Sequence, residues 1–481
     1  MVVANDVNFS IRDFNTLNVA VPPWSIGEKE CSELTNFIFS ASGDLIKRPG
    51  IAKSAFTSAN LVTYPVLSTG QSIYYQTGSA IYKTTSYTSA GTLDTNLANV
   101  VAAATAGGSI FFCTSTGVYR SEGPGSTTPT LISSQNVSHL VYYRFRLWGV
   151  LKGSNSIIFT DAGDYTTFPV DNVINVDSGF EACTYIHPFS DRLIIFKQRS
   201  IRNLYLTDDP ASWSIRSMNQ DVGALNAYSV DSKEGGIYFL GQDGVYRSDG
   251  FTTAKISAPV DPYFLGLKIP SIATINTSLI IFRDYIFVSN LTVAGTRVEL
   301  MYSLRYKTWS LMQNGGAVDA NINRTRRLVC TDLNGVDRLV FGSANAYWYE
   351  LSDTLYTDDG QVYTCRYTSK MFDFDDPSRI KRLKWVMFEL EMPKNDTAWP
   401  PPVGFVPYAK ASYFVDRSVT TEQVTLNYDI SKSYQAFRVP ALVQRVRRVA
   451  VKLEQQSAGP FTLYLMHILY YLKRQLSSDP L

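Results

Sequence analysis

Cysteine and histidine are the residues of this sequence that could bind a metal ion. Three histidines and five cysteines are present, and the cysteines stand far apart, at Cys31, Cys113, Cys183, Cys330 and Cys365. A structural zinc site requires thiolates or imidazoles at short spacings, and no such spacing occurs. The sequence therefore predicts no metal site, and it predicts buried free thiols in a protein assembled in a reducing compartment.

Residue patterns typical of enzymes are missing as well. The sequence contains no Gly-x-Ser-x-Gly elbow, no phosphate-binding glycine loop and no His-Glu-x-x-His pair. Three histidines leave little room for histidine-based acid–base chemistry, although carboxylates could still perform it. We therefore expect no catalytic residue, no cofactor and no enzymatic activity.

Two acidic turns resemble the Asp box of sialidase-like propellers. They run from Asp161 to Phe168 and from Asp208 to Trp213, and the second has proline where the pattern has glycine. In such turns the carboxylate accepts hydrogen bonds from turn amides and the aromatic ring packs between sheets. We interpret both turns as structural; a glycan-binding or sialidase-like β-propeller is the alternative.

Two basic stretches are the candidates for a binding surface. They begin at Arg379 and at Arg445, 66 residues apart, and each is expected to open an apolar strand. A bulge at Arg447–Arg448 would bring Val446 into register with the second strand. Arginine binds carboxylates bidentately, so the stretches could contact an acidic surface of a neighbouring protein, whereas the alternative is a solvated edge protected by charge. The six candidate interface residues are Arg379, Lys381, Arg382, Arg445, Arg447 and Arg448.

Strands are the elements expected to carry these residues. Aromatic residues make up 13% of the 481 residues and charged residues only 18%, a balance that favours half-buried pleated sheets. A net charge of +2 gives no general attraction to nucleic acid or to an anionic membrane. The longest apolar stretch, residues 461–472, is too short to span a bilayer, and the N-terminus lacks a signal-peptide pattern. We therefore expect no membrane insertion.

A repeated segment predicts how the strands are organised. The residues from Gly117 to Gly123 recur almost unchanged from Gly244 to Gly250, 127 residues later, and one third of that distance is about the length of a four-stranded propeller blade. Weaker copies, each preceded by another apolar strand, align on a strand aromatic at Tyr82, Tyr119, Phe159, Tyr205, Tyr246, Tyr302 and Tyr349. Paired strands at this spacing predict a β-propeller of six or seven blades, in which Tyr119 and Tyr246 occupy equivalent positions three blades apart.

The chain as a whole is thus expected to be all-β, with a C-terminal β-sandwich in addition to the propeller. The propeller should span residues 60–356 and the sandwich residues 357–474, followed by a tail over 475–481. Residues 1–59 should supply strands that pack on the sandwich or close the propeller. Within the propeller, the segment 258–280 contains Asp261-Pro262 and is expected to form a loop or a short helix.

One N-terminal stretch carries a family resemblance. From Thr35 through Gly43 and Leu45 to Lys47-Arg48-Pro49-Gly50-Ile51, the sequence resembles the opening of the packaged-DNA stabilisation, or tail nozzle, proteins of short-tailed phages. In that family an asparagine-containing strand is followed by Gly-x-Leu and by a basic or aromatic residue before Pro-Gly. Residues 190–205 and 445–463 are similar to the family's propeller strands and closing strands.

The resemblance implies a structural role in a virion tail, in a protein assembled in the cytoplasm of a host bacterium. Six copies would form a ring beneath the portal and its adaptor ring. The ring would continue the DNA channel, retain packaged double-stranded DNA until ejection, and support a tail needle, fibres or spikes. A nearly neutral chain suits such a conduit, because a strongly basic channel would hold the phosphates. A scaffold propeller with peptide partners is a further alternative.

Overall fold

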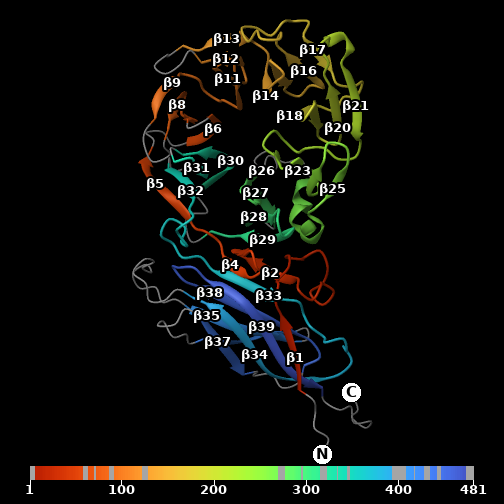
Figure 1. The fold of residues 1–481 in the computed structure, drawn as a ribbon, viewed down its shortest axis with the longest axis vertical. Helices are drawn as coiled ribbons and strands as arrows, with labels where there is room; N and C mark the ends of the chain where they lie inside the picture. The colour runs from red at the N-terminus through yellow and green to blue at the C-terminus, as the bar shows by residue number, and fades with distance from the viewer. Residues whose placement is uncertain are drawn as a thin grey trace, which may run out of the picture. The chain divides into compact units, whose positions relative to one another are not determined.

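The computed structural model describes most of the chain. The described residues are 6–57, 63–69, 72–85, 91–121, 128–268, 277–293, 296–314, 322–332, 334–343, 347–392, 408–415, 418–426, 434–440 and 446–472. These residues are almost entirely β-strands and connecting turns, as the sequence predicted (Figure 1). The tail over 475–481 and Arg445 lie outside the described residues.

The chain divides into two compact units, and their boundaries differ from the expected segments. Unit 1 combines residues 1–52, 299–319 and 352–481, whereas unit 2 combines residues 53–298 and 320–351. The C-terminal strands therefore do not form a separate sandwich over 357–474. Strands from the first fifty residues pair with them, and local sequence patterns do not predict which distant strands will pair.

Unit 2 is built largely from four-stranded antiparallel sheets in a propeller-like arrangement. Four sheets have their strands in chain order: β10–β13, β14–β17, β18–β21 and β22–β25. The strands β10 to β13 span Ala102–Ala106, Ser109–Thr114, Gly117–Arg120 and Thr130–Ser133, and β14 to β17 span Val137–Tyr143, Arg146–Leu151, Ser156–Phe159 and Val173–Asn175. The strands β18 to β21 span Cys183–Phe189, Arg192–Lys197, Ile201–Tyr205 and Ser214–Asn219, and β22 to β25 span Val230–Lys233, Gly236–Leu240, Val245–Ser248 and Thr253–Lys255.

A larger sheet of unit 2 joins strands from both ends of its sequence. Its order is β5-β32-β31-β6-β7-β8-β9, and β30 pairs with β31. The bounds are Ile51–Thr57 for β5, Thr63–Thr69 for β6, Ser72–Thr77 for β7, Ala80–Thr84 for β8, Thr92–Thr95 for β9, Ile322–Thr331 for β30, Asp337–Ser343 for β31 and Tyr347–Leu351 for β32. Unit 2 also contains β26 (Ser278–Phe282) and β27 (Tyr285–Val293), which pair with each other.

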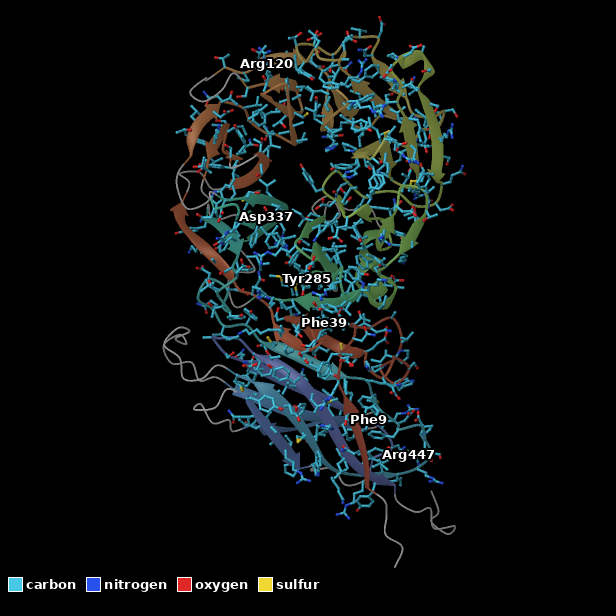
Figure 2. The ribbon with its side chains drawn as sticks, in the orientation of Figure 1. Phe9, Phe39, Arg120, Tyr285, Asp337 and Arg447 are labelled. Carbon is cyan, nitrogen blue, oxygen red and sulfur yellow. The ribbon has the colours of Figure 1, made fainter. Side chains whose placement is uncertain are left out.

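The second strand of each four-stranded sheet is apolar on both faces. In β19 and β23 every residue is buried, whereas the fourth strands β17, β21 and β25 are half-exposed or exposed. The cause is that each sheet lies between two others: the core around Trp148 joins residues of the β14–β17 and β18–β21 sheets, and the core around Phe239 joins the β18–β21 and β22–β25 sheets. Figure 2 shows side chains filling the space between these sheets.

The seven repeat aromatics all lie on the strand that follows such an apolar strand. They are found on β8, β12, β16, β20, β24, β32 and β28 (Thr296–Ser303). Tyr119 pairs with Phe112 on β11, and Tyr246 pairs with Phe239 on β23, so the two residues have the same register in sheets three apart. The predicted equivalence of Tyr119 and Tyr246 is therefore confirmed.

The first strands of the sheets contact one another in succession. β6 contacts β10, β10 contacts β14 and β14 contacts β18, while β22 contacts β26, β26 contacts β30 and β30 contacts β6. Ile194 and Ile237 belong to one buried core, which joins the β18–β21 and β22–β25 sheets. In the segment 258–280, expected to form a loop or a short helix, Ala258–Lys268 form the 3-10 segment η2, and residues 269–276 lie outside the described residues.

Unit 1 is a β structure with strands from both chain ends, and its pairs are antiparallel except for the parallel pair of β2 and β29. One sheet has the order β3-β4-β39-β34-β37, with β1 also paired to β39, and in a second sheet β29, β2, β33, β38, β35 and β36 are neighbours in that order. The bounds are Asp6–Ile11 for β1, Cys31–Thr35 for β2, Phe37–Phe39 for β3, Leu45–Lys47 for β4, Thr308–Met312 for β29, Cys365–Ser369 for β33, Lys381–Glu391 for β34, Tyr408–Val415 for β35, Ser418–Thr425 for β36, Tyr434–Pro440 for β37, Val449–Gln456 for β38 and Thr462–Leu472 for β39. In unit 2, a short 3-10 helix, η1, spans Pro210–Ser212.

Candidate functional site

Arg48, from the N-terminal stretch 35–51, is buried inside unit 1. Arg48 donates two hydrogen bonds to the Asp358 carboxylate, at 3.0 and 2.6 Å, and both side chains are almost completely buried. Its Nε donates to Asn36 Oδ1 at 2.9 Å. Burial alone would lower the pKa of Arg48, but the Asp358 charge outweighs burial and raises it. Charge pairing of this kind holds the motif in place.

Neighbouring residues of the same stretch complete this internal contact. The guanidinium carbon of Arg48 lies 3.9 Å from the Tyr363 ring centroid, and the Lys47 ammonium lies 4.4 Å from it. Burial lowers the pKa of Lys47 to about 8. A Cβ on Gly50 would lie 2.1 Å from the Thr357 carbonyl oxygen, so only glycine fits. The residue types of the stretch thus have a structural explanation within this chain.

The two basic stretches meet in unit 1, but not as two matching strands. The backbones of Lys381 and Val446 exchange hydrogen bonds of 2.7 and 2.9 Å. Arg379 precedes β34, and Arg447–Arg448 precede β38, which belongs to the other sheet. The expected bulge is a corner where the chain leaves its bridge to β34 and enters β38. Beyond the corner, Val449 is buried, as expected of the residue that opens an apolar strand.

The basic side chains of this corner have different environments. Lys381 is fully buried, and its ammonium donates to the carbonyl oxygens of Asp376 and Arg447, so it stabilises the corner and is not an interface residue. Arg379 is exposed and forms an ion pair with Asp376 at 3.1 Å. Three further arginines remain at the surface: Arg447 (Figure 2), Arg382 near the Tyr471 ring, and half-buried Arg448 near the Trp24 ring. We refer to Arg379, Arg382, Arg447 and Arg448 as the basic corner.

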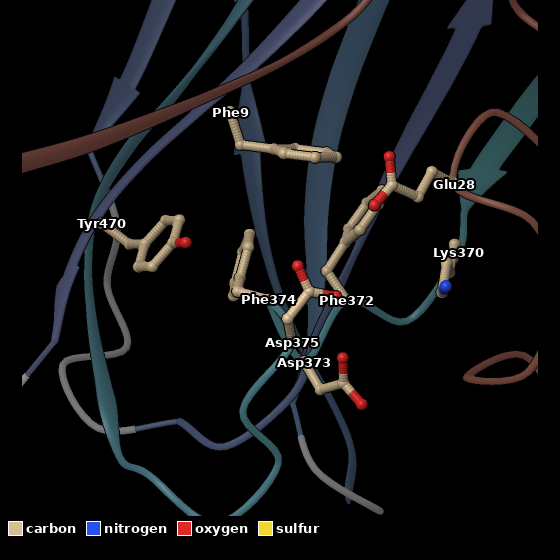
Figure 3. Close-up of a pocket in the computed structure, with 8 residues that line it drawn as sticks. All are labelled: Phe9, Glu28, Lys370, Phe372, Asp373, Phe374, Asp375 and Tyr470. Atoms are coloured by element: carbon tan, nitrogen blue, oxygen red, sulfur yellow. The ribbon is translucent and has the colours of Figure 1, made fainter.

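An aromatic pocket lies beside the basic corner. Its walls are Phe9 of β1, Tyr470 of β39, and Phe372 and Phe374 of the segment before β34 (Figure 3). Phe374 stacks on Tyr470 with ring centroids 3.9 Å apart, and Phe9 lies 4.9 Å from Phe372. The backbone of Phe372 is bridged to Val449, the residue that follows Arg448. The pocket and the corner are therefore fixed to the same strand.

The rim of this pocket is predominantly acidic. Glu28, Asp373 and Asp375 surround an opening of about 60 Å³ together with Lys370. Within the described part of the chain, none of the three carboxylates forms an ion pair. Phe374 and Asp375 have φ angles of 53° and 60°, an arrangement that costs a bulky residue about 1–3 kcal/mol. We refer to the eight lining residues as the acidic–aromatic pocket; the alternation Phe-Asp-Phe-Asp over 372–375 was the signal for it in the sequence.

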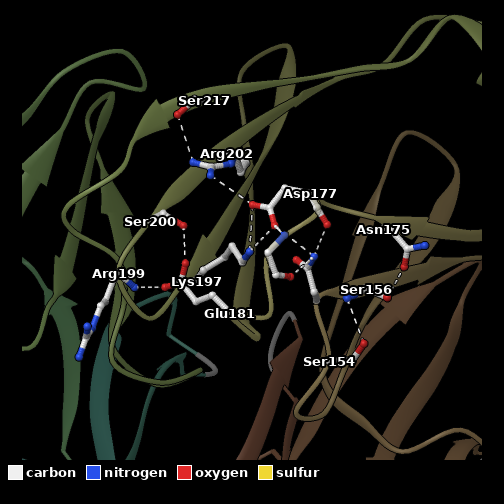
Figure 4. A network of polar contacts seen from close by, with 12 residues as sticks. Ser154, Ser156, Asn175, Asp177, Glu181, Lys197, Arg199, Ser200, Arg202 and Ser217 are labelled. Carbon is white, nitrogen blue, oxygen red and sulfur yellow. Dashed lines mark hydrogen bonds and ion pairs between the residues drawn. The ribbon is translucent and has the colours of Figure 1, made fainter.

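A polar network joins two sheets of unit 2 (Figure 4). Asp177, in the loop after β17, accepts hydrogen bonds from the buried Lys197 ammonium at 2.8 and 2.9 Å and forms an ion pair with Arg202 at 3.2 Å. Partial burial acts to raise the pKa of Asp177, but the Lys197 hydrogen bond and other contacts lower it overall. Nearby, Glu181 accepts from Ser200 at 2.7 Å. These groups satisfy one another, as expected of a structural network.

The acidic turns that resemble Asp boxes hold aromatic rings between sheets. Trp213 packs 5.0 Å from Phe159 and 5.3 Å from Trp148, and its indole nitrogen donates to the Thr207 carbonyl oxygen. Asp209 accepts from the Ala211 amide at 2.9 Å, and Asp164 accepts from the Thr166 amide at 2.8 Å. These contacts match the structural interpretation of both turns.

Other predicted groups have simple environments. All five cysteines are free and buried, as predicted. Among the described residues, no group of three or more His, Cys, Asp or Glu side chains is arranged to hold a metal ion. No helix in the described ranges is long and apolar enough to cross a membrane.

Comparison with known proteins identifies no family. No protein-family profile and no curated protein sequence matches the chain. Similar solved structures include the AfRom2 CNH domain (10% identity, TM-score 0.40, 64% of this chain and 99% of that one) and the N-terminal domain of Nup159 (11%, 0.39, 66% and 98%). Another is the extracellular domain of the one-component system BT4673 from B. thetaiotaomicron (10%, 0.43, 88% and 62%). Since identities and TM-scores are this low, these proteins give no information on function.

Proposed function

We propose that the chain is a non-enzymatic structural protein of a phage tail, the subunit of a nozzle ring. In this role six copies form a ring below the portal and its adaptor ring, continue the DNA channel, and support a needle, fibres or spikes. The protein belongs to the virion tail and is assembled in the host bacterial cytoplasm. The proposal rests on the phage-like stretch from Asn36 to Gly50, whose contacts with Asp358 and Tyr363 form a buried core of unit 1.

The observation that supports assembly most directly is the pair of oppositely charged surfaces on unit 1. The basic corner offers the guanidinium groups of three exposed arginines and of half-buried Arg448, and the acidic–aromatic pocket offers carboxylates with no ion pair among the described residues. Contact between the corner of one copy and the pocket of the next is heterologous, and heterologous contacts close into rings when the rotation is suitable. Guanidinium groups can bind both the carboxylates and the faces of the aromatic rings.

We also infer that unit 2 is a propeller of seven blades. Seven first strands, β6, β10, β14, β18, β22, β26 and β30, follow one another around the unit. In the larger sheet β5 from the N-terminal segment lies next to β32. A blade formed by β30, β31, β32 and β5 would take its outer strand from the start of the chain, which closes the ring between the two ends of the unit.

Alanine substitution of Arg447 and Arg448 tests the assembly proposal. Truncating one member of a desolvated charge pair weakens an interface by about 2–5 kcal/mol, whereas solvated charges contribute almost nothing. We expect the double variant to lose ring assembly in sedimentation velocity, and docking onto a portal–adaptor complex, at an unchanged melting temperature. The variant Asp373→Asn/Asp375→Asn should lose assembly in the same way.

The matched control removes two exposed cations of unit 2, Lys152 and Arg199. The variant Lys152→Ala/Arg199→Ala changes the net charge equally and should assemble as the wild type does. If the Arg447/Arg448 variant docks normally and melts normally, the basic corner is only a solvated edge. Turnover of glycans by the purified protein, lost on a single carboxylate substitution, would instead favour the sialidase-like alternative.

A further inference from the structure

Two histidines of unit 2 lie on neighbouring first strands that belong to different sheets. His139 is on β14 and His187 is on β18, and we refer to them as the histidine pair. β14 and β18 contact each other but are not hydrogen-bonded as strands of one sheet. The contact between the two sheets therefore depends on side chains, and the core around Trp148 supplies its apolar part.

Tyr185 neighbours both imidazoles. Its ring centroid lies 4.0 Å from that of His139 and 6.1 Å from that of His187, and the rings of Tyr185 and His187 are 22° from parallel. The His139 ring is also hydrogen-bonded to the backbone of Ile186 on β18. The histidine pair and Tyr185 thus form one cluster across the contact between the two sheets.

The hydrogen bonds of this cluster fit neutral imidazoles and not imidazolium ions. His139 Nε2 and both ring nitrogens of His187 are buried and have no hydrogen-bond partner among the described residues. A neutral imidazole has one N–H donor, whereas an imidazolium ion has two. Each protonation therefore adds a charged donor without an acceptor, which is more destabilising than a neutral one.

The carboxylate of Asp231, on β22, is close enough to act on this cluster. Burial raises the pKa of Tyr185, and the charge of Asp231 raises it further. The carboxylate accepts hydrogen bonds from the amides of Ser232 and Ile281, at 2.8 and 2.7 Å, but burial still raises the pKa of Asp231 to about 6. This negative charge is therefore lost before the pH is low enough to protonate the buried imidazoles.

Among the described residues, the other titratable groups beside the cluster add no negative charge. Arg327 and Tyr228 line a cavity of about 140 Å³ together with His139 and Tyr185, and neither side chain is negative in acid. Burial raises the pKa of Cys113 on β11, so its thiol is neutral as well. The cations of the adjoining strands β15, β19 and β22 are paired with aspartates: Arg146 with Asp161, Arg192 with Asp191, Lys197 with Asp177 and Lys233 with Asp284.

The pKa values of the histidine pair have the sign that these surroundings require. Burial, above all, lowers the pKa of His139 to about 3, with a smaller contribution from His187, and burial lowers the pKa of His187 to about 4. An imidazole in water titrates near pH 6.5, so the contact between the sheets is fully stable above about pH 6.5 and loses stability as the pH falls toward 4 and 3. Asp231 acts in the opposite direction, because its pKa is raised, and it stabilises the contact as the pH falls below about 6.

The same two sheets are also joined at their turn ends, by hydrogen bonds that do not titrate in acid. The Tyr143 hydroxyl donates to the Ser190 carbonyl oxygen at 3.0 Å, and the Arg144 guanidinium donates to the Leu206 carbonyl oxygen at 2.7 Å. Acid therefore weakens the contact near His139 and leaves its turn end intact.

We propose that the histidine pair is an acid-sensitive switch between the β14–β17 and β18–β21 sheets. When both imidazoles carry protons, the first strands separate around His139 while the turn ends stay joined. Cys183, at the start of β18, belongs to the buried core that joins the two sheets, so its thiol becomes accessible to solvent. The contact closes again when the imidazoles lose their protons.

Labelling of the cysteines of the full chain with dithiodipyridine tests the proposal, because this reagent reacts with thiols in acidic as well as in neutral buffers. Mass spectrometry locates the labelled positions, and each rate is divided by the rate for glutathione at the same pH. We expect Cys183 to react about a hundredfold faster at about pH 4.5 than at about pH 7.5. Cys330, a buried thiol on β30 of the same unit, and Cys365, in unit 1, should show no such change.

Substitutions of the histidine pair separate its effect from that of other groups. His187→Phe removes one titrating group without breaking a hydrogen bond, since neither ring nitrogen has a partner among the described residues. We expect this variant to melt no lower than the wild type at neutral pH, and the acid acceleration of Cys183 labelling to fall by about tenfold or more. His139→Phe/His187→Phe should remove the acceleration, and Asp231→Asn should increase it. His467→Phe, on β39 in unit 1, is the matched control and should leave it unchanged.

Two kinds of result would overturn the proposal. One is labelling of Cys183 that acid does not accelerate in the wild type, or accelerates equally in the wild type and in His187→Phe. The other is labelling of Cys183 and Cys330 together, which would show that acid unfolds unit 2 as a whole. If the double variant does not fold, His187→Phe decides alone, because it loses no hydrogen bond among the described residues.

Discussion

Several buried charged side chains of this protein bind partners that lie far away in the sequence. Arg48 and Asp358 are separated by 310 positions, yet each satisfies the other, and the Asp358 carboxylate also accepts from the Ile51 amide at 3.1 Å. Lys381 plays a comparable part in the basic corner through carbonyl oxygens. Buried charges of this kind are destabilising unless their partners are present, so they define which segments must meet.

Removing one partner of the buried pair should destabilise unit 1 severely. We expect Arg48→Met or Asp358→Asn to lower the free energy of unfolding by about 3–5 kcal/mol, because an unpaired charge or a lost set of hydrogen bonds stays buried. The combination Arg48→Met/Asp358→Leu should recover much of the loss, since apolar groups of similar volume need no partner. Urea unfolding followed by tryptophan fluorescence measures this.

The exposed pair of Lys29 and Asp13 is the control for that experiment. Its side chains are 54% and 70% exposed, and exposed pairs contribute little. Lys29→Ala should therefore leave the unfolding midpoint unchanged. An unchanged midpoint in Arg48→Met would show that the buried pair does not hold the segments together.

At the level of strands and turns, the repeated segment has a glycine as well as an aromatic residue at equivalent positions of its hairpins. Gly117 and Gly244 lie at the start of equivalent third strands, with φ angles of 152° and 155°. A Cβ would lie 2.2 Å from the Ser133 carbonyl oxygen at Gly117 and 2.2 Å from Ser257 Oγ at Gly244. Both the backbone conformation and the space exclude other residues, so the repeated glycine fixes how the hairpin turns.

Alanine at either glycine should be strongly destabilising, and by similar amounts. Strain from the backbone and overpacking together amount to about 3 kcal/mol, and thermal unfolding of Gly117→Ala and Gly244→Ala measures it. Gly153→Ala isolates the backbone contribution, because Gly153 has a φ of 71° and a Cβ at that position would meet no atom within 4 Å. A smaller loss in the repeat variants than in Gly153→Ala would contradict the steric explanation.

Across the whole molecule, the N-terminal segment serves both units. β1 and β4 pair with β39 and β2 pairs with β33 in unit 1, while most of β5 belongs to unit 2 and lies next to β32. These pairings close loops of several hundred residues. Such closure is entropically unfavourable until the final contacts form, so we expect both units to fold cooperatively with the start of the chain.

Deletion of residues 1–57 should therefore destabilise both units. We expect the truncated chain to be degraded rapidly in limited proteolysis, with fragments from each unit, because both lose paired strands. Deletion of residues 1–5 is the control; it leaves every paired residue of β1 in place and should not change the proteolysis pattern. A truncated chain that resists proteolysis as the wild type does would show that these strands are dispensable.

Local signals in the chain were sufficient to predict the all-β class, the repeated hairpins, the matching register of Tyr119 and Tyr246, and the burial of the cysteines. Each of these depends on alternation, turn residues or residue type within a few positions. The folded molecule was needed to learn that Asp358 is the partner of Arg48, that Phe9 meets Phe374, and that Lys381 is buried while Arg447 is exposed. Those outcomes depend on which distant strands become neighbours, and pairing across hundreds of residues leaves no periodic trace in the chain.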